Sequence, residues 1–339
     1  MRSSDNDNNA MPRKNLRIII TRHGERVDFA VGEGWTNPTN GRSDPRIPHL
    51  PPRLNYEDWE FDSPLTVNGE AQSLRVGQRL LRTGLPIDYC YSSPAFRSIQ
   101  TADKILESQG RREIIPVNIE PGLFECPLWY AGAPLPFLSI PELMGGYYNV
   151  QPYYSPVFGG VDINEDEIMY YKRSRKLIDA IVDVHKKMGG NILLSGHAGS
   201  LETLSRAAFH ASPRPERLRE LADRVDYCNY TILERNAITK AWSFIPQQTS
   251  AHHHSTRPLP RATTQPLYQP VPLSYYPNSS RMDHRRTHLP GTRRATNQLV
   301  PRSRSSTGRH FSHSSPQRVS RYTNPTVVGH KRVSRRARI

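Results

Sequence analysis

The sequence predicts an α/β protein: a three-layer α/β/α sandwich with a mainly parallel central sheet, followed by a disordered basic C-terminal tail. Short apolar runs alternate with segments of helical periodicity over most of the first 250 residues, which is typical of a sheet covered by helices on both faces. The net charge also differs between the two parts of the chain. Residues 251–339 hold 17 basic residues and one acidic residue, a balance of +16, whereas residues 1–250 hold 29 and 30, a balance of −1.

We expect three regions: a disordered N-terminus over residues 1–15, one folded domain over 16–246, and a disordered tail rich in Arg, Ser, Pro and His over 247–339. Of the 89 residues that follow position 250, only 13 are Val, Ile, Leu or Phe. Such a segment cannot bury enough apolar surface to offset the entropy cost of ordering it. Because the excess positive charge lies in the tail, the folded domain is not itself predicted to bind nucleic acid.

The first elements follow from apolar runs and helix caps. Leu16–Ile20 is largely β-branched, which is typical of a buried strand. Thr66–Leu81 carries apolar residues at helical spacing and is predicted to be a helix. Tyr89–Tyr91 is predicted to be a short strand, after which Ser93 suits a helix N-cap and Pro94 the first helical position.

The later elements continue the alternation. An amphipathic helix is predicted over Ile168–Met188, and Gly189 and Gly190 should end it. The remaining predicted elements are a strand over 191–194, a helix capped by Ser200 and running to Phe209, and a hairpin that pairs 225–233 with 238–244. Two long stretches, 27–63 and 124–164, have little periodicity. Loops of this length are typical of lids and pocket walls, and surface insertions without a role are the alternative.

Polar side chains of interest occur in four places, three of them at or just after the end of a predicted strand and the fourth in the mouth of a long loop. These side chains are Arg22, His23 and Arg26 after the first strand, Arg97 in Ser-Ser-Pro-Ala-Phe-Arg, Glu125 in Glu-Pro-Gly-Leu-Phe-Glu, and His197 in Ser-Gly-His-Ala-Gly. Ligands of α/β sheets bind beyond the carboxyl ends of the strands. We therefore expect these six side chains to lie close together.

These residue types favour phosphate chemistry. Arginine presents a fork of donors that fits phosphate oxygens, and a helix N-terminus attracts anions. A neutral imidazole can attack phosphorus, and a carboxyl group can protonate a leaving oxygen. Each residue alone has an ordinary alternative, such as a solvated loop histidine, a capping histidine or an exposed arginine. Together they predict a site that binds a phosphate dianion, attacks it and protonates the leaving group.

The motifs resemble the histidine phosphatase superfamily, also called phosphoglycerate-mutase-like, over roughly residues 16–245 and in family order. Locally, the segments ending at Asp28, Ala102 and Glu125 are most similar to the phosphatase domain of the suppressor of T-cell receptor signalling (ubiquitin-associated and SH3 domain-containing) proteins. These segments are Arg-His-Gly-Glu-Arg-Val-Asp, Ser-Pro-Ala-Phe-Arg-Ser-Ile-Gln-Thr-Ala and Glu-Pro-Gly-Leu-Phe-Glu.

The resemblance implies a phosphomonoesterase that forms a phosphohistidine, with a phosphate ester or phosphotyrosine as substrate. In this scheme His23 attacks the phosphoryl group, and Glu125 acts as general acid for the leaving alcohol and then as base for water. The phosphate oxygens and their transition-state charge would be held by Arg22, Arg26, Arg97 and His197, so the resemblance makes His197 a catalytic residue beside His23 and Glu125. No cofactor or metal is implied, since the arginines supply the positive charge.

Other functions stay open. A phosphoglycerate-type mutase is the nearest alternative, but the mutases tend to have Ser or Gln where this chain has Arg26 and Val27. A non-catalytic phosphate-binding scaffold is another. The basic clusters of the tail could bind nucleic acid or acidic surfaces, and the alternative is a solvated tail without a partner. With three cysteines and no apolar run of membrane-spanning length, we expect a cytoplasmic protein, or a nuclear one if the clusters act as an import signal.

Overall fold

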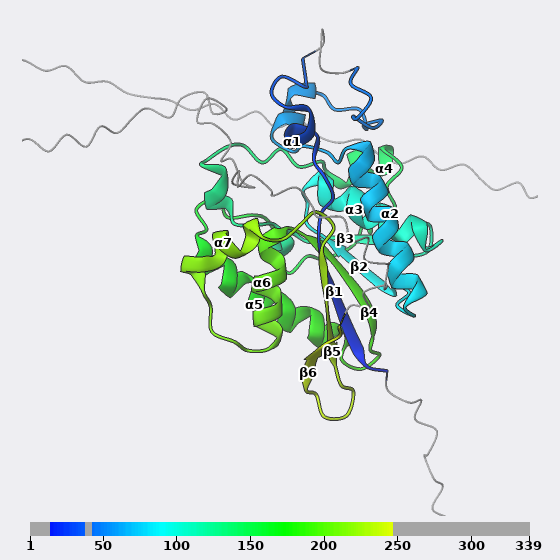
Figure 1. Cartoon of the computed structure of the whole chain (residues 1–339), viewed down its shortest axis with the longest axis vertical. Coiled ribbons are helices and arrows are strands. Elements are labelled where there is room, and N and C mark those ends of the chain that lie inside the picture. Colours follow the sequence, from blue (N-terminus) through cyan, green and yellow to red (C-terminus); the bar gives the residue numbers. More distant parts are fainter. Residues whose placement is uncertain (1–13, 38–42, 247–339) are drawn as a thin grey trace, which may run out of the picture. The chain divides into compact units, whose positions relative to one another are not determined.

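The computed structural model describes residues 14–37 and 43–246. The disorder predicted for residues 247–339 and for most of residues 1–15 lies outside these described residues. Figure 1 shows the described part as a central sheet with helices on both sides, so the predicted three-layer α/β/α sandwich is confirmed.

Six strands form one sheet in the order β3-β2-β4-β1-β5-β6. The strands are β1 (Leu16–Arg22), β2 (Tyr89–Ser92), β3 (Val117–Ile119), β4 (Gly190–Gly196), β5 (Tyr230–Arg235) and β6 (Trp242–Phe244). The first four strands run parallel to one another, whereas β5 runs antiparallel to β1, and β6 antiparallel to β5. The carboxyl ends of β1 to β4 therefore meet at one edge of the sheet.

Helices cover both faces of this sheet. They are α1 (Val27–Val31), α2 (Val67–Arg82), α3 (Phe96–Ser108), α4 (Ile140–Gly145), α5 (Glu167–His185), α6 (Ala198–Ala208) and α7 (Leu218–Asp223). In Figure 1, α2, α3 and α4 lie on one side of the strands, and α5, α6 and α7 lie on the other.

Two buried clusters follow from the alternation of side chains along β1 and β4. Ile19 and Leu193 belong to the cluster that includes side chains of α2 and α3. Ile18, Ile20 and Leu194 point the opposite way, into the cluster with α5 and α6. A strand buried on both faces has apolar residues at consecutive positions, which explains why these runs were visible in the sequence.

The predicted helices begin and end close to their expected positions. Thr66 caps α2 by accepting a hydrogen bond from the Gly69 amide at 2.9 Å. Asp166 caps α5 by accepting one from the Met169 amide at 2.8 Å. Beyond α5 the chain turns at Gly189, whose φ of +67° lies in the left-handed region that glycine adopts without strain.

Two predicted caps are wrong. Helix α3 begins at Phe96 with Ala95 as its N-cap, so Ser93 and Pro94 precede it. Helix α6 begins at Ala198 with the unusual N-cap His197, whose amide donates to Ser200 Oγ at 3.0 Å. Serine is a preferred N-cap residue, but Ser93 lies against the His197 ring, and Ser200 is the third residue of α6, where it accepts from the amide of the N-cap.

The two aperiodic stretches contain short helices that the sequence did not reveal. The first holds α1 and a 3-10 helix over Tyr56–Glu60, and the second holds α4. Strand β3 was also missed, because three residues are too few to establish a period. Within the described part of the chain, no helix is long and apolar enough to cross a membrane, and the three cysteines are buried and unpaired.

Candidate active site

His23 directly follows β1, and the side chains predicted to surround it come from the ends of the neighbouring strands. Register pairs Arg22 with Gly196 across β1 and β4, and Ser92 with Ser195 across β2 and β4. The chain segments that follow these strands carry Arg97 and His197. The imidazole rings of His23 and His197 meet edge to face, with 5.4 Å between their centroids.

The His23 ring is almost completely buried, with 2% of its surface exposed. Its Nδ1 lies 2.8 Å from the carbonyl oxygen of Gly24. Because a carbonyl oxygen can only accept, Nδ1 carries the hydrogen and Nε2 keeps its lone pair. Burial, and then the charges of Arg97 and Arg22, hold the pKa of His23 well below 6.5. The ring is therefore neutral at physiological pH.

A close backbone contact fixes the loop that carries His23. A Cβ atom on Gly24 would lie 2.6 Å from the carbonyl oxygen of Gly69, at the start of α2. A Cβ atom on Gly69 would lie 2.3 Å from the carbonyl oxygen of Glu25. Both positions therefore require glycine. The Gly24 amide also donates to Thr101 Oγ1 at 3.0 Å, which ties the loop to α3.

Two arginines beside His23 are oriented by different partners. Arg22 donates to the carbonyl oxygen of Val225, and its guanidinium lies 4.3 Å from the centre of the Tyr227 ring. Arg26 forms a forked ion pair with Asp28, in which Nε lies 3.0 Å from Oδ1. Burial lowers the pKa of Arg22. Burial alone would also lower the pKa of Arg26, but the charges of Asp28, Tyr130, Tyr227 and Glu125 together outweigh it and the pKa is raised.

The third arginine belongs to a buried cluster with Glu125, Tyr130 and His197. Arg97 Nη2 donates to Glu125 Oε1 at 2.9 Å and to the Tyr130 hydroxyl at 2.7 Å. The Tyr130 hydroxyl donates to the same Glu125 oxygen at 2.5 Å. His197 Nδ1 lies 3.3 Å from Glu125 Oε1, and His197 Nε2 lies 2.9 Å from Ser93 Oγ.

These contacts set the charges of the cluster. Burial alone would raise the pKa of Glu125, but His197, Arg97 and Tyr130 outweigh it and hold the pKa well below 4.5. Burial lowers the pKa of His197 to about 4, although Glu125 opposes this shift. In the protein by itself, Glu125 is therefore ionised and His197 neutral near pH 7.

Some residues of this region were not predicted. Tyr130 lies in an aperiodic loop, five positions after Glu125, and no spacing rule indicates it. Arg173 of α5 donates to the carbonyl oxygens of Gly122 at 2.6 Å and Phe124 at 2.7 Å, and pairs with Glu165 at 2.6 Å. Arg173 thereby holds the backbone just before Glu125. Its only sequence signal is its place on a predicted helix.

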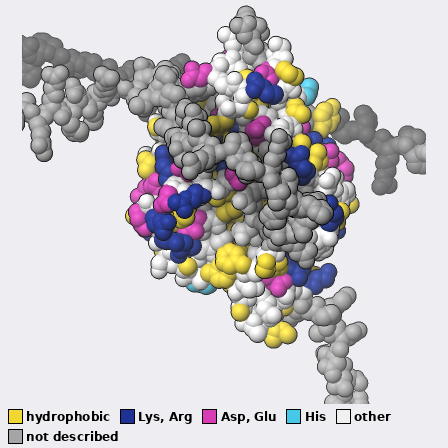
Figure 2. All heavy atoms as spheres, viewed as in Figure 1, with side chains coloured by type: hydrophobic (Ala, Val, Ile, Leu, Met, Phe, Trp, Pro, Cys, Tyr) yellow, Lys and Arg dark blue, Asp and Glu magenta, His cyan; other side chains and the backbone are white. Residues whose placement is uncertain are grey.

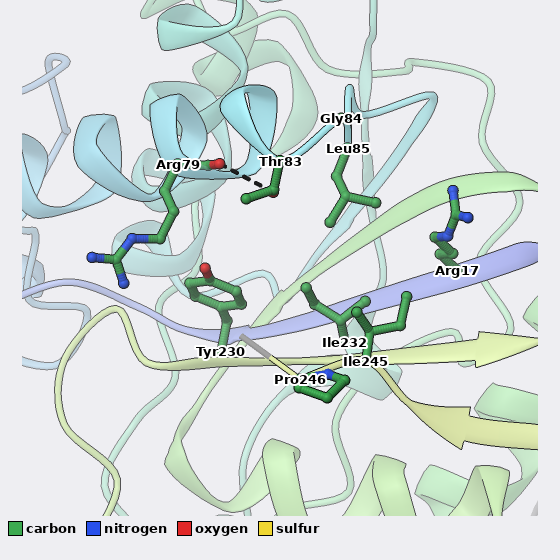
Figure 3. A pocket seen from close by; sticks show the side chains of 9 residues that line it. All are labelled: Arg17, Arg79, Thr83, Gly84, Leu85, Tyr230, Ile232, Ile245 and Pro246. Atoms are coloured by element: carbon green, nitrogen blue, oxygen red, sulfur yellow. Dashed lines mark hydrogen bonds between the residues drawn. The ribbon is translucent and has the colours of Figure 1, made fainter. Parts of the chain in front are cut away.

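A surface cavity of about 230 Å³ lies elsewhere, between the end of α2 and strands β1 and β5 (Figure 3). Its lining includes Arg17, at the amino end of β1, and Ile232. None of the six predicted side chains lines it. Among residues 14–37 and 43–246, no group of three or more His, Cys, Asp or Glu side chains could hold a metal ion.

Comparison with known proteins identifies the family. Residues 52–244 match the histidine phosphatase superfamily, branch 1. The chain belongs to the histidine phosphatase superfamily. The predicted family is thus confirmed, and the matched residues include Arg97, Glu125 and His197 but begin after His23.

Relatives of this chain include the subgroup that the motifs indicated. The chain is 33% identical over 258 residues to the ecdysteroid-phosphate phosphatase of Drosophila melanogaster, covering 72% of this chain and 34% of the relative. It is 32% identical over 237 residues to human ubiquitin-associated and SH3 domain-containing protein B, covering 66% of this chain and 36% of the relative. The chain thus spans about a third of the length of these relatives.

A solved structure has the same fold. The ecdysone phosphate phosphatase of Bombyx mori, determined in complex with tungstate, is 27% identical and superposes with a TM-score of 0.62. The superposition covers 72% of this chain and 98% of that chain.

Proposed function

We propose that the protein is a phosphatase that hydrolyses phosphate monoesters through a phosphohistidine on His23. The observation that carries this proposal is a buried, neutral His23 with the lone pair on Nε2 and three arginines around it. Membership of the histidine phosphatase superfamily and the phosphatase names of its relatives support it. A dianion would offset the repulsion among the arginines, which favours binding of phosphate at this point.

The chemistry would proceed in two steps. His23 Nε2 attacks phosphorus, the bond to the alcohol oxygen breaks, and Glu125 gives its proton to that oxygen. Water then gives a proton to Glu125 and attacks the phosphohistidine, which releases inorganic phosphate and restores neutral His23. Glu125 must gain a proton before the first step. The charge of the arriving phosphate, and its demand for Arg97, would raise the pKa of Glu125 in that direction.

The surroundings of the arginines favour an apolar or aromatic alcohol as leaving group. The Arg26 guanidinium lies 4.9 Å from the centre of the Phe29 ring, and Phe29 is 46% exposed. Arg22 stacks on Tyr227 in the same way. Phosphate-binding groups that border aromatic rings suit phosphotyrosine or the phosphate of a bulky apolar alcohol. One relative is an ecdysteroid-phosphate phosphatase, and an ecdysteroid phosphate belongs to this class.

Hydrolysis and transfer can be separated in one assay. We expect the full chain to release inorganic phosphate from a phosphotyrosine peptide and from a steroid phosphate, faster than from phosphoglycerate. We also expect no transfer of labelled phosphate to added phosphoglycerate. Faster transfer to phosphoglycerate than to water would indicate a mutase instead, and a lack of both turnover and labelled protein would indicate a binding scaffold.

A second proposal concerns the tail, because the charge of residues 251–339 is +16 while residues 1–250 carry −1. Figure 2 shows basic and acidic side chains interspersed on the visible face of the described part, in contrast to the excess of basic residues in the tail sequence. We propose that the tail binds nucleic acid or another acidic surface through charge alone. The basic clusters of the tail sequence would also support nuclear import.

Salt dependence tests the second proposal. The full chain should bind duplex DNA, and a chain ending at residue 246 should not, while both should have the same kcat on an aryl phosphate. Binding should weaken with salt: the logarithm of the binding constant should fall with the logarithm of the salt concentration, with a slope of about −0.9 per phosphate neutralised. Binding that is insensitive to salt, or selective for one sequence, would contradict a purely electrostatic tail.

A further inference from the structure

The Tyr130 hydroxyl occupies a position between Arg97 and Glu125. It accepts a hydrogen bond from Arg97 Nη2 at 2.7 Å and donates one to Glu125 Oε1 at 2.5 Å. Arg97 Nη2 and His197 Nδ1 contact that same oxygen, at 2.9 Å and 3.3 Å. Among the described residues, every hydrogen bond and ion pair of the Glu125 side chain therefore falls on Oε1. Among these residues the other oxygen, Oε2, makes no hydrogen bond.

The chain holds the Tyr130 ring from several sides. Tyr130 is the last residue of a 3-10 helix over Pro127–Tyr130, and Ala131 turns the chain with a φ of +50°. The centre of its ring lies 5.2 Å from that of Phe124. The neighbouring Trp129 donates through Nε1 to Glu167 Oε1 at 2.8 Å, at the start of α5. The hydroxyl is thereby directed at Glu125.

We propose that Tyr130 is the positioning residue for the proton donor of this phosphatase: it holds Glu125 by Oε1 and leaves Oε2 to carry the proton to the leaving oxygen. This inference rests on the proposed function. A substrate phosphate would also bind Arg97, for example through Nε, which has no hydrogen-bond partner among the described residues, so the charge of Arg97 would be shared between Glu125 and the phosphoryl oxygens. The Tyr130 hydroxyl is uncharged, and its one hydrogen is donated to Glu125.

A neutral donor also suits a carboxyl group that must gain and lose a proton. An arginine contact strongly favours the ionised carboxylate and so opposes protonation. A phenol hydroxyl can donate to Oε1 both when the group is ionised and when Oε2 carries a proton. Burial, and the adjacent Glu125, raise the pKa of Tyr130 well above 10. Tyr130 therefore keeps its hydrogen throughout the working pH range.

Tyr130→Phe isolates the hydroxyl, because phenylalanine keeps the ring that packs against Phe124. We expect kcat on an alkyl phosphate to fall about tenfold, the size expected for one lost hydrogen bond to a charged group, with a much smaller change on an activated aryl phosphate. Loss of a donor to the ionised carboxylate raises the pKa of Glu125 in the substrate complex. The alkaline limb of kcat should therefore move to higher pH, by up to about one unit.

A matched control is Tyr147→Phe, since Tyr147 is 86% exposed. This variant should leave kcat on both substrates and the pH profile of kcat unchanged. Incorporation of 3-fluorotyrosine at position 130 provides the opposite change. Its more acidic hydroxyl binds the carboxylate more strongly, so the alkaline limb should move to lower pH. Thermal unfolding of each variant checks that the fold is retained.

The outcomes separate this inference from the proposed function. Two results would overturn the role of Tyr130 in a protein that still forms labelled phosphohistidine. One is an equal loss of kcat on alkyl and aryl esters, and the other is an alkaline limb that moves with neither substitution. If the unmodified chain forms no labelled phosphohistidine with any ester, the proposed function itself is wrong. A fluorotyrosine shift in the expected direction supports the role of Tyr130 even if the Phe variant is unstable.

Discussion

His23→Ala should abolish phosphatase activity, with a fall in kcat of ~10³-fold or more, as for loss of a nucleophile in other enzymes with covalent intermediates. The reason is that Nε2 of His23 is the atom with a free lone pair at the centre of the arginines. The measurement is release of phosphate from an aryl ester, together with labelling of the protein from a radioactive ester in a single turnover. Neither should be detectable above background.

The control for this experiment is His49→Ala, because His49 is exposed and lies outside the site. It should keep full activity and full labelling. Activity of more than a few per cent in His23→Ala, with an unchanged unfolding temperature, would contradict the nucleophile assignment. Because the pKa of His23 lies well below 6.5, the nucleophile stays neutral as the pH falls through 6.5. Protonation of His23 should limit the wild-type rate only at lower pH.

Glu125→Gln should reduce kcat on alkyl phosphates by ~10²–10⁴-fold, the usual contribution of a general acid. Aryl phosphates with acidic leaving groups should lose far less, because their leaving oxygen needs little protonation in the transition state. Glutamine keeps the size of the side chain but cannot transfer a proton. The alkaline limb of kcat should also disappear, since it reports the loss of the Glu125 proton in the substrate complex.

Glu113→Gln is the matched control, because 83% of the Glu113 side chain is exposed. Glu113→Gln should leave the ratio of kcat on alkyl phosphates to kcat on aryl phosphates the same as in the unmodified chain. If Glu125→Gln slows both ester types equally and the alkaline limb persists, another group supplies the proton and Glu125 serves binding. The comparison requires at least three leaving groups of different acidity, measured at saturating substrate.

The sequence was informative wherever a local pattern reports on burial. Runs such as Leu16–Ile20 are apolar at every position because β1 is covered on both faces, and 66–81 has the period of a helix with one buried stripe. The positions of the six polar residues could also be predicted. They come at or shortly after the ends of strands, and parallel strands place those ends at one edge of the sheet.

Local patterns were insufficient where a residue's partner is distant in the chain. Ser93 and Ser200 have the preferences of helix caps, but the fold places both against His197, and the helices begin elsewhere. The three-residue strand β3 gains its structure from pairing with β2 rather than from any period of its own.

The sequence by itself determined the class of the fold, the family and the six candidate residues, since these depend on periodicity and on residue types at the ends of strands. Only the tertiary structure decided the charge states and the orientation of the groups around His23. Burial and converging charges make His23 neutral and Glu125 ionised, and both effects come from atoms brought together by folding. The positions of Tyr130 and Arg173 against the Glu125 segment were decided in the same way, because long-range contacts leave no trace in local spacing.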